Sequence, residues 1–236
     1  MKRFLEAVLL TSSLLWLVSA PVGATGLKYG LELQGGMGQY TLDDEWSWAF
    51  ENRWRWDGGA GLFAEMEGPA GLRFGTGLAY RRVGDVLRSR LTFDGFSGPT
   101  SLEFRASLAL DQLALPARVE HAVPGVPALA LELGAQMDYT LSAVYDFSDL
   151  PPLPARPARR YAQIFEDVGT IGDGEDVTND TNRLGVAATA GLTWRTHLLS
   201  HDATLGFRYE RGLTPLWKDG LDRFANRAGL SLRWAF

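Results

Sequence analysis

Cysteine is absent from this chain of 236 residues, and it has only three histidines and no excess of basic charge. Without cysteine the chain cannot form disulfides, thiolate metal sites or an acylated lipoprotein anchor. The net charge of −5 argues against a nucleic-acid partner, as does the lack of a basic stripe. Beyond the first two dozen residues no run is apolar enough for a transmembrane helix. If the chain crosses a membrane, it must do so with strands.

The first residues have the pattern of a secretory signal. Lys2 and Arg3 supply positive charge, residues 7–18 are largely apolar, and Val22, Gly23 and Ala24 are small. We therefore predict a signal peptide over 1–24, cleaved after Ala24, and a mature domain over 25–236. The alternative is an uncleaved anchor, but an apolar core of roughly twelve residues is short for a span.

The mature chain alternates between apolar and small or polar residues with a period of two. Leu72, Phe74 and Leu78 alternate with small and charged residues such as Arg73 and Gly75, as expected of strands with one apolar face. About eight such segments occur, near 26–41, 57–67, 71–83, 101–119, 127–145, 183–196, 202–213 and 225–236. Most have ten residues or more, the length of a tilted strand that crosses a bilayer. The predicted fold class is all-β: a closed, antiparallel, up-and-down transmembrane barrel.

The fourth segment changes phase between Leu110 and Leu113. A β-bulge at Asp111–Gln112 would restore the alternation, because one extra residue exchanges the two faces.

The predicted connections alternate in length. Long loops at 42–56, 84–100 and 146–182 alternate with short turns at 68–70, 121–126 and 197–201, and the last connection, 214–224, is intermediate. This alternation is typical of barrels with long outer loops and short periplasmic turns. Both termini would then be periplasmic. Aromatic girdles are expected from Tyr29, Trp194, Trp234 and Phe236 at the periplasmic ends, and from Tyr80, Phe104, Tyr139 and Tyr209 at the outer ends.

The face opposite the leucines carries charges of both signs. We predict a lumen charge network of Glu32, Glu65, Arg73, Arg81, Glu132, Arg195, Arg208, Glu210, Arg227 and Arg233, with Glu103, Arg105, Asp111 and Asp138 on the same face. Glu65 should face Arg73 across a tight hairpin, and Arg227 should meet Arg208 and Glu210. A polar conduit is one interpretation. A salt-bridged plug is favoured, because eight strands enclose only enough room for side chains.

The C-terminus ends in Leu230, Leu232, Trp234 and Phe236, apolar at every second residue. This ending resembles the signal by which outer-membrane assembly machinery recognises its clients, so that machinery is an expected partner.

Three stretches, Gly61–Glu65, Leu113–Arg118 and Gly206–Thr214, resemble the PorT-like family of outer-membrane β-barrel proteins. The resemblance spans nearly the whole mature chain through short motifs. It implies a bacterial outer membrane location, with membrane lipid and lipopolysaccharide as partners, and a possible accessory role in protein secretion. The proline-rich loop at 146–182 departs from the family.

No catalytic group and no cofactor are predicted, and we expect a structural or interaction protein that contacts an unknown protein partner through its outer loops. A lipid-modifying enzyme would need a histidine base, but His121, His197 and His201 all fall in the predicted periplasmic turns. A soluble lipocalin-like carrier is a further alternative, and it would hold its apolar residues inside.

Two loops hold weaker candidate sites. Oxygen ligands for Ca²⁺ could come from Asp173, Glu175, Asp176 and Asp180, although a solvated acidic loop is the commoner arrangement. In the first loop, Trp46, Trp48, Phe50, Trp54 and Trp56 form either an upper girdle, which is favoured, or a platform for sugars.

Overall fold

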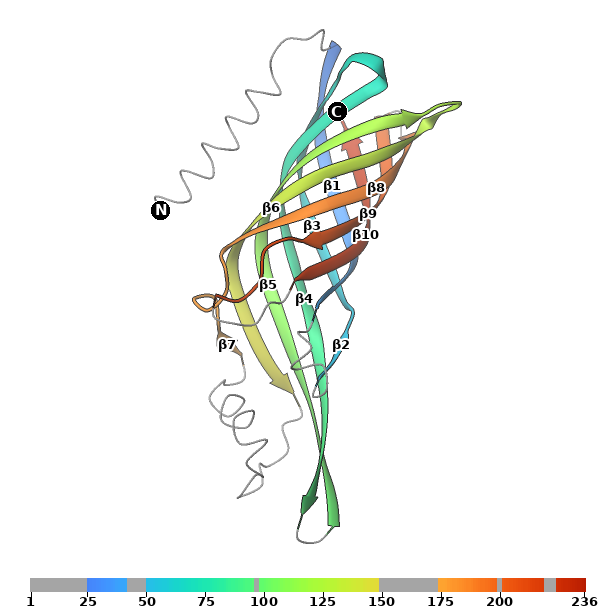
Figure 1. The fold of residues 1–236 in the computed structure, drawn as a ribbon. Helices are drawn as coiled ribbons and strands as arrows, with labels where there is room; N and C mark the ends of the chain where they lie inside the picture. The colour runs from blue at the N-terminus through green and yellow to red at the C-terminus, as the bar shows by residue number, and fades with distance from the viewer. Residues whose placement is uncertain (1–24, 42–49, 96–97, 149–173, 199–200, 219–223) are drawn as a thin grey trace.

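The computed structural model describes residues 25–41, 50–95, 98–148, 174–198, 201–218 and 224–236 (Figure 1). The predicted signal peptide lies outside these residues. Within them, the regular structure is β-strand apart from one 3-10 turn at Pro69–Gly71. None of the described segments forms a helix of the length and apolarity that a membrane crossing requires.

Eight strands form a closed antiparallel barrel, as predicted. Each is paired with its neighbour along the chain, and β10 pairs with β1 from Gly30↔Ala235 to Tyr40↔Ala225, which closes the ring. Two short strands lie outside the ring: β2 (Phe50–Arg53) pairs with β4, and β7 (Glu175–Asp176) pairs with β6. The ring consists in order of β1 (Thr25–Tyr40), β3 (Arg55–Glu67), β4 (Leu72–Gly95), β5 (Gly98–Val123), β6 (Val126–Ser148), β8 (Leu184–Leu198), β9 (His201–Gly212) and β10 (Ala225–Ala235).

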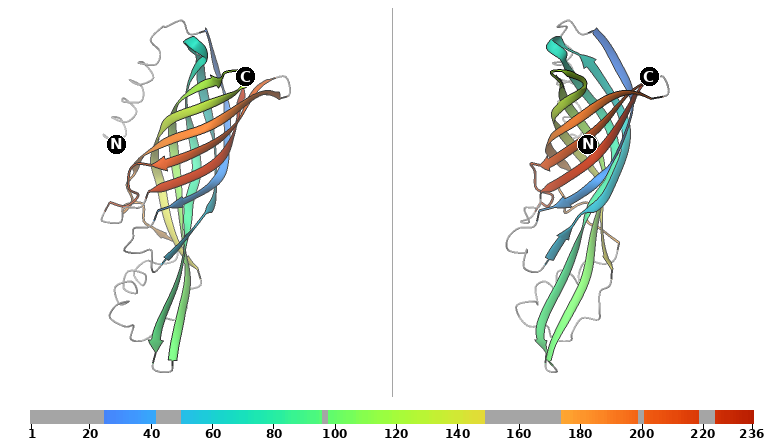
Figure 2. Two further views of the ribbon diagram at one scale, coloured as in Figure 1. Left: turned by 45° about the vertical axis from the view of Figure 1, so that its right-hand side comes forward. Right: turned by 90° about the vertical axis from the view of Figure 1, so that its right-hand side faces the viewer.

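Both ends of the barrel domain lie at one end of the barrel, which we call the proximal end (Figures 1 and 2). The described turns there are tight. One runs through Ala70 and Gly71, both at positive φ (56° and 74°), and the other has Pro124 followed by Gly125 at φ 82°. Proline before a glycine of positive φ is the composition of a type II turn. The short turns predicted at 68–70 and 121–126 are confirmed, although β5 extends to Val123 and shortens the second.

The opposite, distal end carries a long hairpin where the sequence predicted a loop at 84–100. β4 and β5 stay paired from Gly84↔Ala109 to Gly95↔Gly98, and this hairpin projects well beyond the ring (Figure 2). The loop prediction was wrong because we expected a strand only where one of its faces was apolar. Residues 88–90 read Arg-Ser-Arg, and a strand can be fully paired there without an apolar face.

The two faces of the wall are arranged as predicted. Leu31, Leu131 and Leu230 point outward and are 47 %, 54 % and 68 % exposed, whereas Glu32 and Glu132 point inward and are 1 % and 2 % exposed. A soluble carrier barrel would have the reverse arrangement, with apolar residues lining a cavity. The lipocalin-like alternative is therefore inconsistent with the structure.

The phase change in β5 has a different cause from the one predicted. Inward and outward positions alternate without interruption along the described side chains of β5, so Leu108 and Leu110 point inward and Leu113 points outward. The register does shift between Asp111 and Gln112, but the extra residue is Leu141 on the neighbouring strand β6. What changes along β5 is the polarity of each face. The inside is apolar at Leu108 and Leu110 and charged at Arg118 and Glu120.

Mostly apolar side chains fill the distal end of the barrel, around one buried carboxylate, that of Asp85, which is 0 % exposed and lies opposite Leu108 in the register. Leu108 and Leu110 are 1 % and 0 % exposed, and Val83 and Leu87 on β4 are buried as well. Leu216, from the connection between β9 and β10, is also buried and covers the lumen from the distal side. Asn182 holds this connection in place, since its side-chain amide donates to the carbonyls of Pro215 (2.9 Å) and Trp217 (3.1 Å).

Candidate functional site

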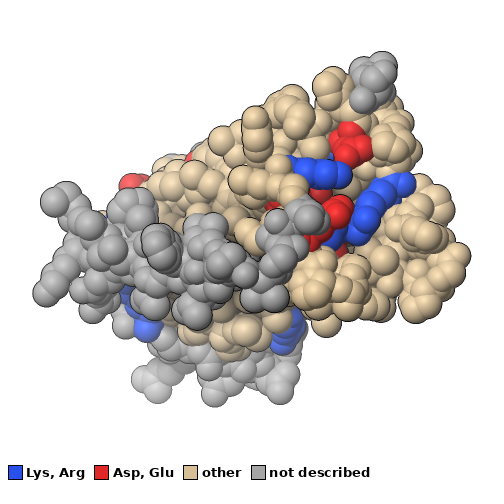
Figure 3. Space-filling model, turned by 90° about the horizontal axis from the view of Figure 1, so that it is seen from above, with Lys and Arg blue, Asp and Glu red and all other residues tan. Residues whose placement is uncertain are grey.

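Two groups of ionised side chains fill the lumen, one above the other. Seen from the proximal end, basic and acidic residues gather in a hollow framed by uncharged residues (Figure 3). We call the first group the proximal cluster and the second the distal cluster. The proximal cluster consists of Glu32, Glu65, Arg73, Arg118, Glu120, Glu132, Arg208 and Arg233, and the distal cluster of Asp57, Arg81, Asp138, Glu210 and Arg227, all on inward positions.

Arg233 of β10 is at the centre of the proximal cluster and is 1 % exposed. Its guanidinium contacts Glu65 at 3.4 Å and Glu132 at 3.5 Å, and it also pairs closely with Glu120. Arg73 contacts two of the same carboxylates: it pairs with Glu120 and lies 3.5 Å from Glu65. The Arg233 contacts join β10 to β3, β5 and β6, which are not its neighbours, so they tie separate parts of the wall together.

The remaining pairs of the proximal cluster are equally enclosed. Arg118 Nη1 donates to both carboxylate oxygens of Glu32 at 3.1 Å, and its guanidinium carbon lies 5.9 Å from the centre of the Phe63 ring. Arg208 Nε donates to Glu132 at 2.6 Å. The cluster therefore sets four carboxylates against four guanidiniums. This balance matters because an unpaired buried charge costs several kcal/mol.

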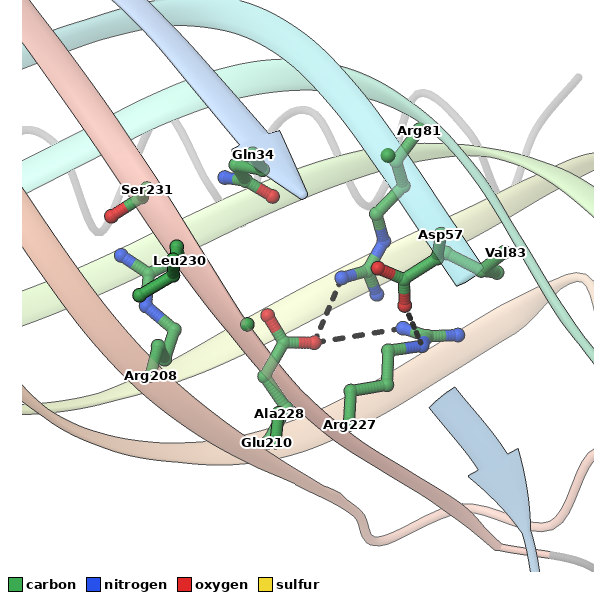
Figure 4. Close-up of a pocket in the computed structure, with 12 residues that line it drawn as sticks. Gln34, Asp57, Arg81, Val83, Arg208, Glu210, Arg227, Ala228, Leu230 and Ser231 are labelled. Carbon is green, nitrogen blue, oxygen red and sulfur yellow. Dashed lines mark hydrogen bonds and ion pairs between the residues drawn. The ribbon is translucent and has the colours of Figure 1, made fainter. Parts of the chain in front are cut away.

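The distal cluster is centred on Glu210 (Figure 4). Its carboxylate accepts from Arg81 Nη1 at 2.8 Å and lies 3.5 Å from Arg227 Nη1. Arg81 Nη2 reaches Asp138 at 2.6 Å, and Arg227 Nε lies 3.9 Å from Asp57. Five strands contribute one residue each, so this cluster also spans the lumen.

Glycines on the inner wall make room for these side chains. A Cβ added at Gly75 would lie 2.7 Å from Arg118 Nε and 3.0 Å from its Cγ, and one at Gly38 would lie 3.2 Å from Arg227 Cγ. At Gly61 the obstacle is the next strand, since the added Cβ would lie 2.4 Å from the Leu78 carbonyl oxygen. Glycines at inward positions thus leave space for the long charged side chains in the lumen.

The free space that remains in the lumen is small. Two cavities of about 40 Å³ each border the distal cluster, which is room for about three water molecules each. Gln34 lines the first cavity, and its buried amide nitrogen has no protein partner among the described residues. Leu216 and Pro215 line the second. Side chains therefore fill the described lumen, in keeping with the predicted plug.

The structure brings most of the predicted lumen network together. Nine of its ten residues take part in ion pairs of the two clusters. The exception is Arg195, which is half-buried near the proximal end, where its Nε has no hydrogen-bond partner in the described part of the chain. Glu65 does face Arg73, and Arg227 does meet Glu210.

Some inward assignments were wrong, and some inward residues were missed. Arg105 is exposed, and Asp111 lies on the outward face; the side chain of Glu103 is outside the described part. The misplacement follows from the bulge expected within β5. Arg118 and Glu120 were overlooked, although the alternation of Leu113, Leu115, Ala117 and Val119 already placed them inside.

On the outward face, hydroxyl and guanidinium groups gather at the level of the distal cluster. Tyr80 Oη donates to Asp111 at 2.7 Å, and Ser142 Oγ donates to the other oxygen of the same carboxylate at 2.8 Å. On β9, Tyr209 Oη donates to Asn226 at 2.9 Å, and Arg211 donates to the same oxygen. The distal ends of two distant pairs of strands thus carry the same kind of polar group.

Of the predicted girdle aromatics, Tyr29, Trp194 and Phe236 are exposed at the proximal end and Tyr80 and Tyr209 toward the distal end. Tyr139 is half-buried on the outward face, and the side chain of Phe104 lies outside the described part. Trp234 is half-buried and edge-on to His201. Leu230, Leu232 and Trp234 lie on the outward face of β10, and the exposed Phe236 directly follows its end; their role in assembly stays a prediction. Of the first-loop aromatics, Trp54 and Trp56 are exposed, Phe50 begins β2, and Trp46 and Trp48 fall outside the described residues.

The candidate calcium ligands do not converge in the described part of the chain. Among those residues, no three carboxylate, histidine or cysteine side chains come together as a metal site, and Asp173 lies outside them. Asp176 accepts hydrogen bonds from the amide and hydroxyl of Thr178, which lower the pKa of this carboxyl below its ordinary value. Asp180 and Lys218 join two loops through their main chains (3.1 Å).

The three histidines lie at the proximal end, as predicted. His197 Nδ1 lies 3.0 Å from Asp202, whose carboxylate also accepts from Lys28 at 2.7 Å. These residues surround the turn between β8 and β9, at the opposite end of the barrel from the distal loops. His121 is exposed on β5.

The sequence matches no family model and no curated protein. Among solved structures, the chain is similar to Neisserial surface protein A (13 % identity, TM-score 0.44), with 91 % of this chain and 99 % of that chain covered. It is also similar to Ail, the attachment invasion locus protein of Yersinia pestis (12 %, 0.40; 90 % and 100 % covered). A third is the outer membrane protein OprG of Pseudomonas aeruginosa (12 %, 0.27; 89 % and 91 %). At these scores the likeness carries no conclusion about function, and the barrel is established by its own strand pairing. The finer resemblance to PorT-like proteins stays a prediction.

Proposed function

We propose that this chain is an integral β-barrel of the bacterial outer membrane whose lumen is closed by ion pairs and which acts through its distal loops and its long hairpin. The observation that carries the proposal is a reversal of polarity across the wall of the barrel. Toward the proximal end the wall is apolar outside and charged inside. Beyond the distal cluster it is polar outside and mostly apolar inside, with the buried carboxylate of Asp85 as the exception.

The reversal occurs at one level on three neighbouring strands. Across β4, β5 and β6, the register places Tyr80 beside Leu113 and Leu113 beside Tyr139. Further toward the distal end, by two residues on β4 and β5 and by three on β6 because of the extra residue Leu141, the register aligns Arg82, Asp111 and Ser142. A hydrocarbon boundary between these two rows explains both. Tyrosines favour the interface, and charged groups favour water.

The apolar band has the height that a bilayer requires. On β4 the outward residues from Leu72 to Tyr80 are free of charge, and on β6 the same holds from Leu129 to Tyr139. These stretches have nine and eleven residues, as the numbering shows, and a strand tilted by about 45° needs about 9–11 residues to cross a membrane. The leucines of this band are too exposed to be explained by a soluble protein's surface alone.

The distal end carries the structural elements that could contact other molecules. It carries the projecting β4–β5 hairpin, β2 on the side of β4, and the contact between the segments that follow β7 and β9. The filled lumen favours a structural or interaction role over a conduit. We also propose that the protein is not an enzyme, since its histidines lie at the opposite end from these loops.

Fractionation tests the location, and electrophysiology tests the closed lumen. The folded protein should enter the outer-membrane fraction and migrate differently on a gel before and after heating. In planar bilayers it should give no steady conductance. Recovery in the soluble fraction without detergent would contradict the location, and stable open channels would contradict the plug.

The role of the distal loops needs a separate test. A chain whose hairpin is shortened beyond the Arg88↔Arg105 pair keeps every strand of the ring and the buried Leu87 and Leu108, so it should still insert. We expect it to lose the adhesion, secretion or permeability phenotype that deletion of the whole chain produces. If the shortened chain restores that phenotype fully, the hairpin is not the acting part. Co-purification of secretion components would instead favour an accessory role in secretion.

A further inference from the structure

Residues that touch inside a barrel must lie at the same height, and this gives a way to compare heights around the wall. Arg81 and Glu210 are in contact across the lumen at 2.8 Å. Their sequence neighbours point outward from nearly the same height, because successive residues of a strand alternate between faces. Tyr80 and Arg82 on β4 therefore lie level with Tyr209 and Arg211 on β9.

These two outward groups are built alike. Each has a tyrosine and an arginine two residues apart on one strand, and an oxygen acceptor on the next strand. At β4 and β5 the acceptor is Asp111, which takes a hydrogen bond from Tyr80 and lies 4.0 Å from Arg82 Nε. At β9 and β10 it is Asn226, which takes hydrogen bonds from both Tyr209 and Arg211.

The tyrosine fixes the acceptor, and the acceptor fixes the arginine. Arg82 is 64 % exposed, and its nearest approach to Asp111 is 4.0 Å from Nε, so its guanidinium stays accessible from outside. Both oxygens of Asp111 accept from hydroxyl groups, those of Tyr80 and Ser142. This distributes the negative charge of Asp111 and leaves Arg82 the more exposed charge of the pair.

The outward residues on the proximal side of this level point to the ligand. On the proximal side they are apolar: Leu78 and Phe207 are 48 % and 52 % exposed. A guanidinium one step beyond a tyrosine at the edge of an apolar band lies where lipid headgroups lie. Arginine presents a planar fork of donors that fits phosphate oxygens.

We propose that Arg82 and Arg211 form two binding sites for the phosphate groups of outer-leaflet lipid, each oriented by its tyrosine and its acceptor. The proposal rests on the outer-membrane location argued above and adds a specific ligand chemistry to it. The two sites hold the distal end of the barrel at the phosphate layer, on two sides of the ring.

Native mass spectrometry of the full mature barrel in detergent tests this, with three lipids offered in turn. Bis-phosphorylated lipid A carries the proposed ligand group on a glycolipid. A lipid A stripped of phosphate keeps the acyl chains and sugars, and phosphatidylglycerol carries a phosphate on a glycerolipid. Inorganic phosphate added as a competitor shows whether the phosphate alone is sufficient.

We expect wild-type protein to retain bis-phosphorylated lipid A more than the stripped form. Arg82→Gln and Arg211→Gln should each weaken retention about fivefold, and the double variant more. Arg82→Lys should keep part of the binding, because it keeps the charge and loses the fork. Arg105→Gln is the matched control, since this exposed arginine lies on β5 six residues beyond Asp111.

The outcomes separate this inference from the proposed function. If the variants fold, as heat-modified migration shows, and retain lipid A as well as wild type does, the phosphate sites are wrong and the membrane location stands. Equal retention of stripped lipid A would likewise overturn them. Preference for phosphatidylglycerol over lipid A would leave the phosphate sites in place on a different lipid. A barrel that binds none of the lipids and remains soluble without detergent would contradict the location itself.

Discussion

The proximal and distal halves of this barrel are filled in opposite ways. The proximal lumen holds Arg118, Glu120 and Arg233 in ion pairs, whereas the lumen beyond the distal cluster holds Leu108 and Leu110 in a mostly apolar core. The wall outside reverses in the same place. The comparison teaches that the filling of a small barrel is matched to what covers its exterior. Where hydrocarbon covers the wall, the apolar residues point outward and the polar residues point into the lumen. Where water covers the wall, the apolar residues point inward, as in a soluble protein.

Removal of Arg233 should do the most damage, because it leaves Glu65, Glu120 and Glu132 without their shared partner. Arg233→Ala should lower the free energy of unfolding by about 3–5 kcal/mol, measured by urea denaturation in vesicles. The control is Arg53→Ala on the exposed strand β2, where the pair with Glu51 at 3.0 Å should contribute less than about 1 kcal/mol. Equal losses in the two variants would mean that the buried network does not stabilise the barrel.

The outward face offers a matched pair of leucine substitutions. Leu133 is 65 % exposed in the middle of the apolar band of β6, and Leu213 is 58 % exposed two residues beyond Arg211. Leu133→Arg should cost about 2–4 kcal/mol, as an arginine near the middle of a bilayer does. Leu213→Arg should change stability by no more than about 0.5 kcal/mol. If both were neutral in vesicles, the band would not face hydrocarbon.

Glycine substitutions test how tightly the charged half is packed. Gly75→Ala brings a Cβ within 3.0 Å of two Arg118 side-chain atoms, and overpacking of this kind costs about 1–3 kcal/mol. Gly35 lies on the lipid side of β1 with no atom within 4 Å of an added Cβ. Gly35→Ala should therefore leave the urea midpoint nearly unchanged. A tolerated Gly75→Ala would indicate that Arg118 can move away from Glu32 without loss.

The smallest effect is expected in the distal cap. Asn182→Ala removes two hydrogen bonds to the β9–β10 connection, each with a net contribution of about 1 kcal/mol. We expect faster proteolysis between Leu213 and Lys218 with little change in the unfolding of the ring. Asn179→Ala, an exposed neighbour, is the control. A large drop in global stability would show that the cap and the ring unfold as one unit.

The fold was predictable because period-two alternation is a local property that survives in a single sequence. Every strand that crosses the membrane needs an apolar outward face, so the alternation recurs in each of them, as in Leu72 to Tyr80. The prediction failed at β5, where a change of phase was assigned to a bulge. In fact the alternation continues through Leu108 and Leu110, which both point inward, and what changes along β5 is the polarity of its inward and outward faces. The hairpin beyond Gly84 was missed because the prediction searched for strands with one apolar face. A hairpin that projects beyond the membrane does not need such a face.

The lumen residues were largely predictable, but their partners were not. Glu65 and Arg73 were paired correctly because one tight hairpin joins their strands. Arg81 and Glu210 lie on β4 and β9, and their contact depends on the stagger of strands around the ring. No local pattern encodes that stagger. The paired tyrosine and arginine groups on the outer wall went unrecognised because their common height follows from this same contact.

A labelling scan along β5 tests the reversal of polarity most directly, because the chain has no cysteine of its own. Single cysteines at the outward positions Ala109, Leu113, Leu115 and Ala117 would be exposed to a charged, membrane-impermeant maleimide after insertion into vesicles. We predict rapid labelling of Ala109→Cys and protection from Leu113→Cys through Ala117→Cys. Labelling of Leu115→Cys at the rate of Ala109→Cys would contradict the account, because the leucine face would then lie in water.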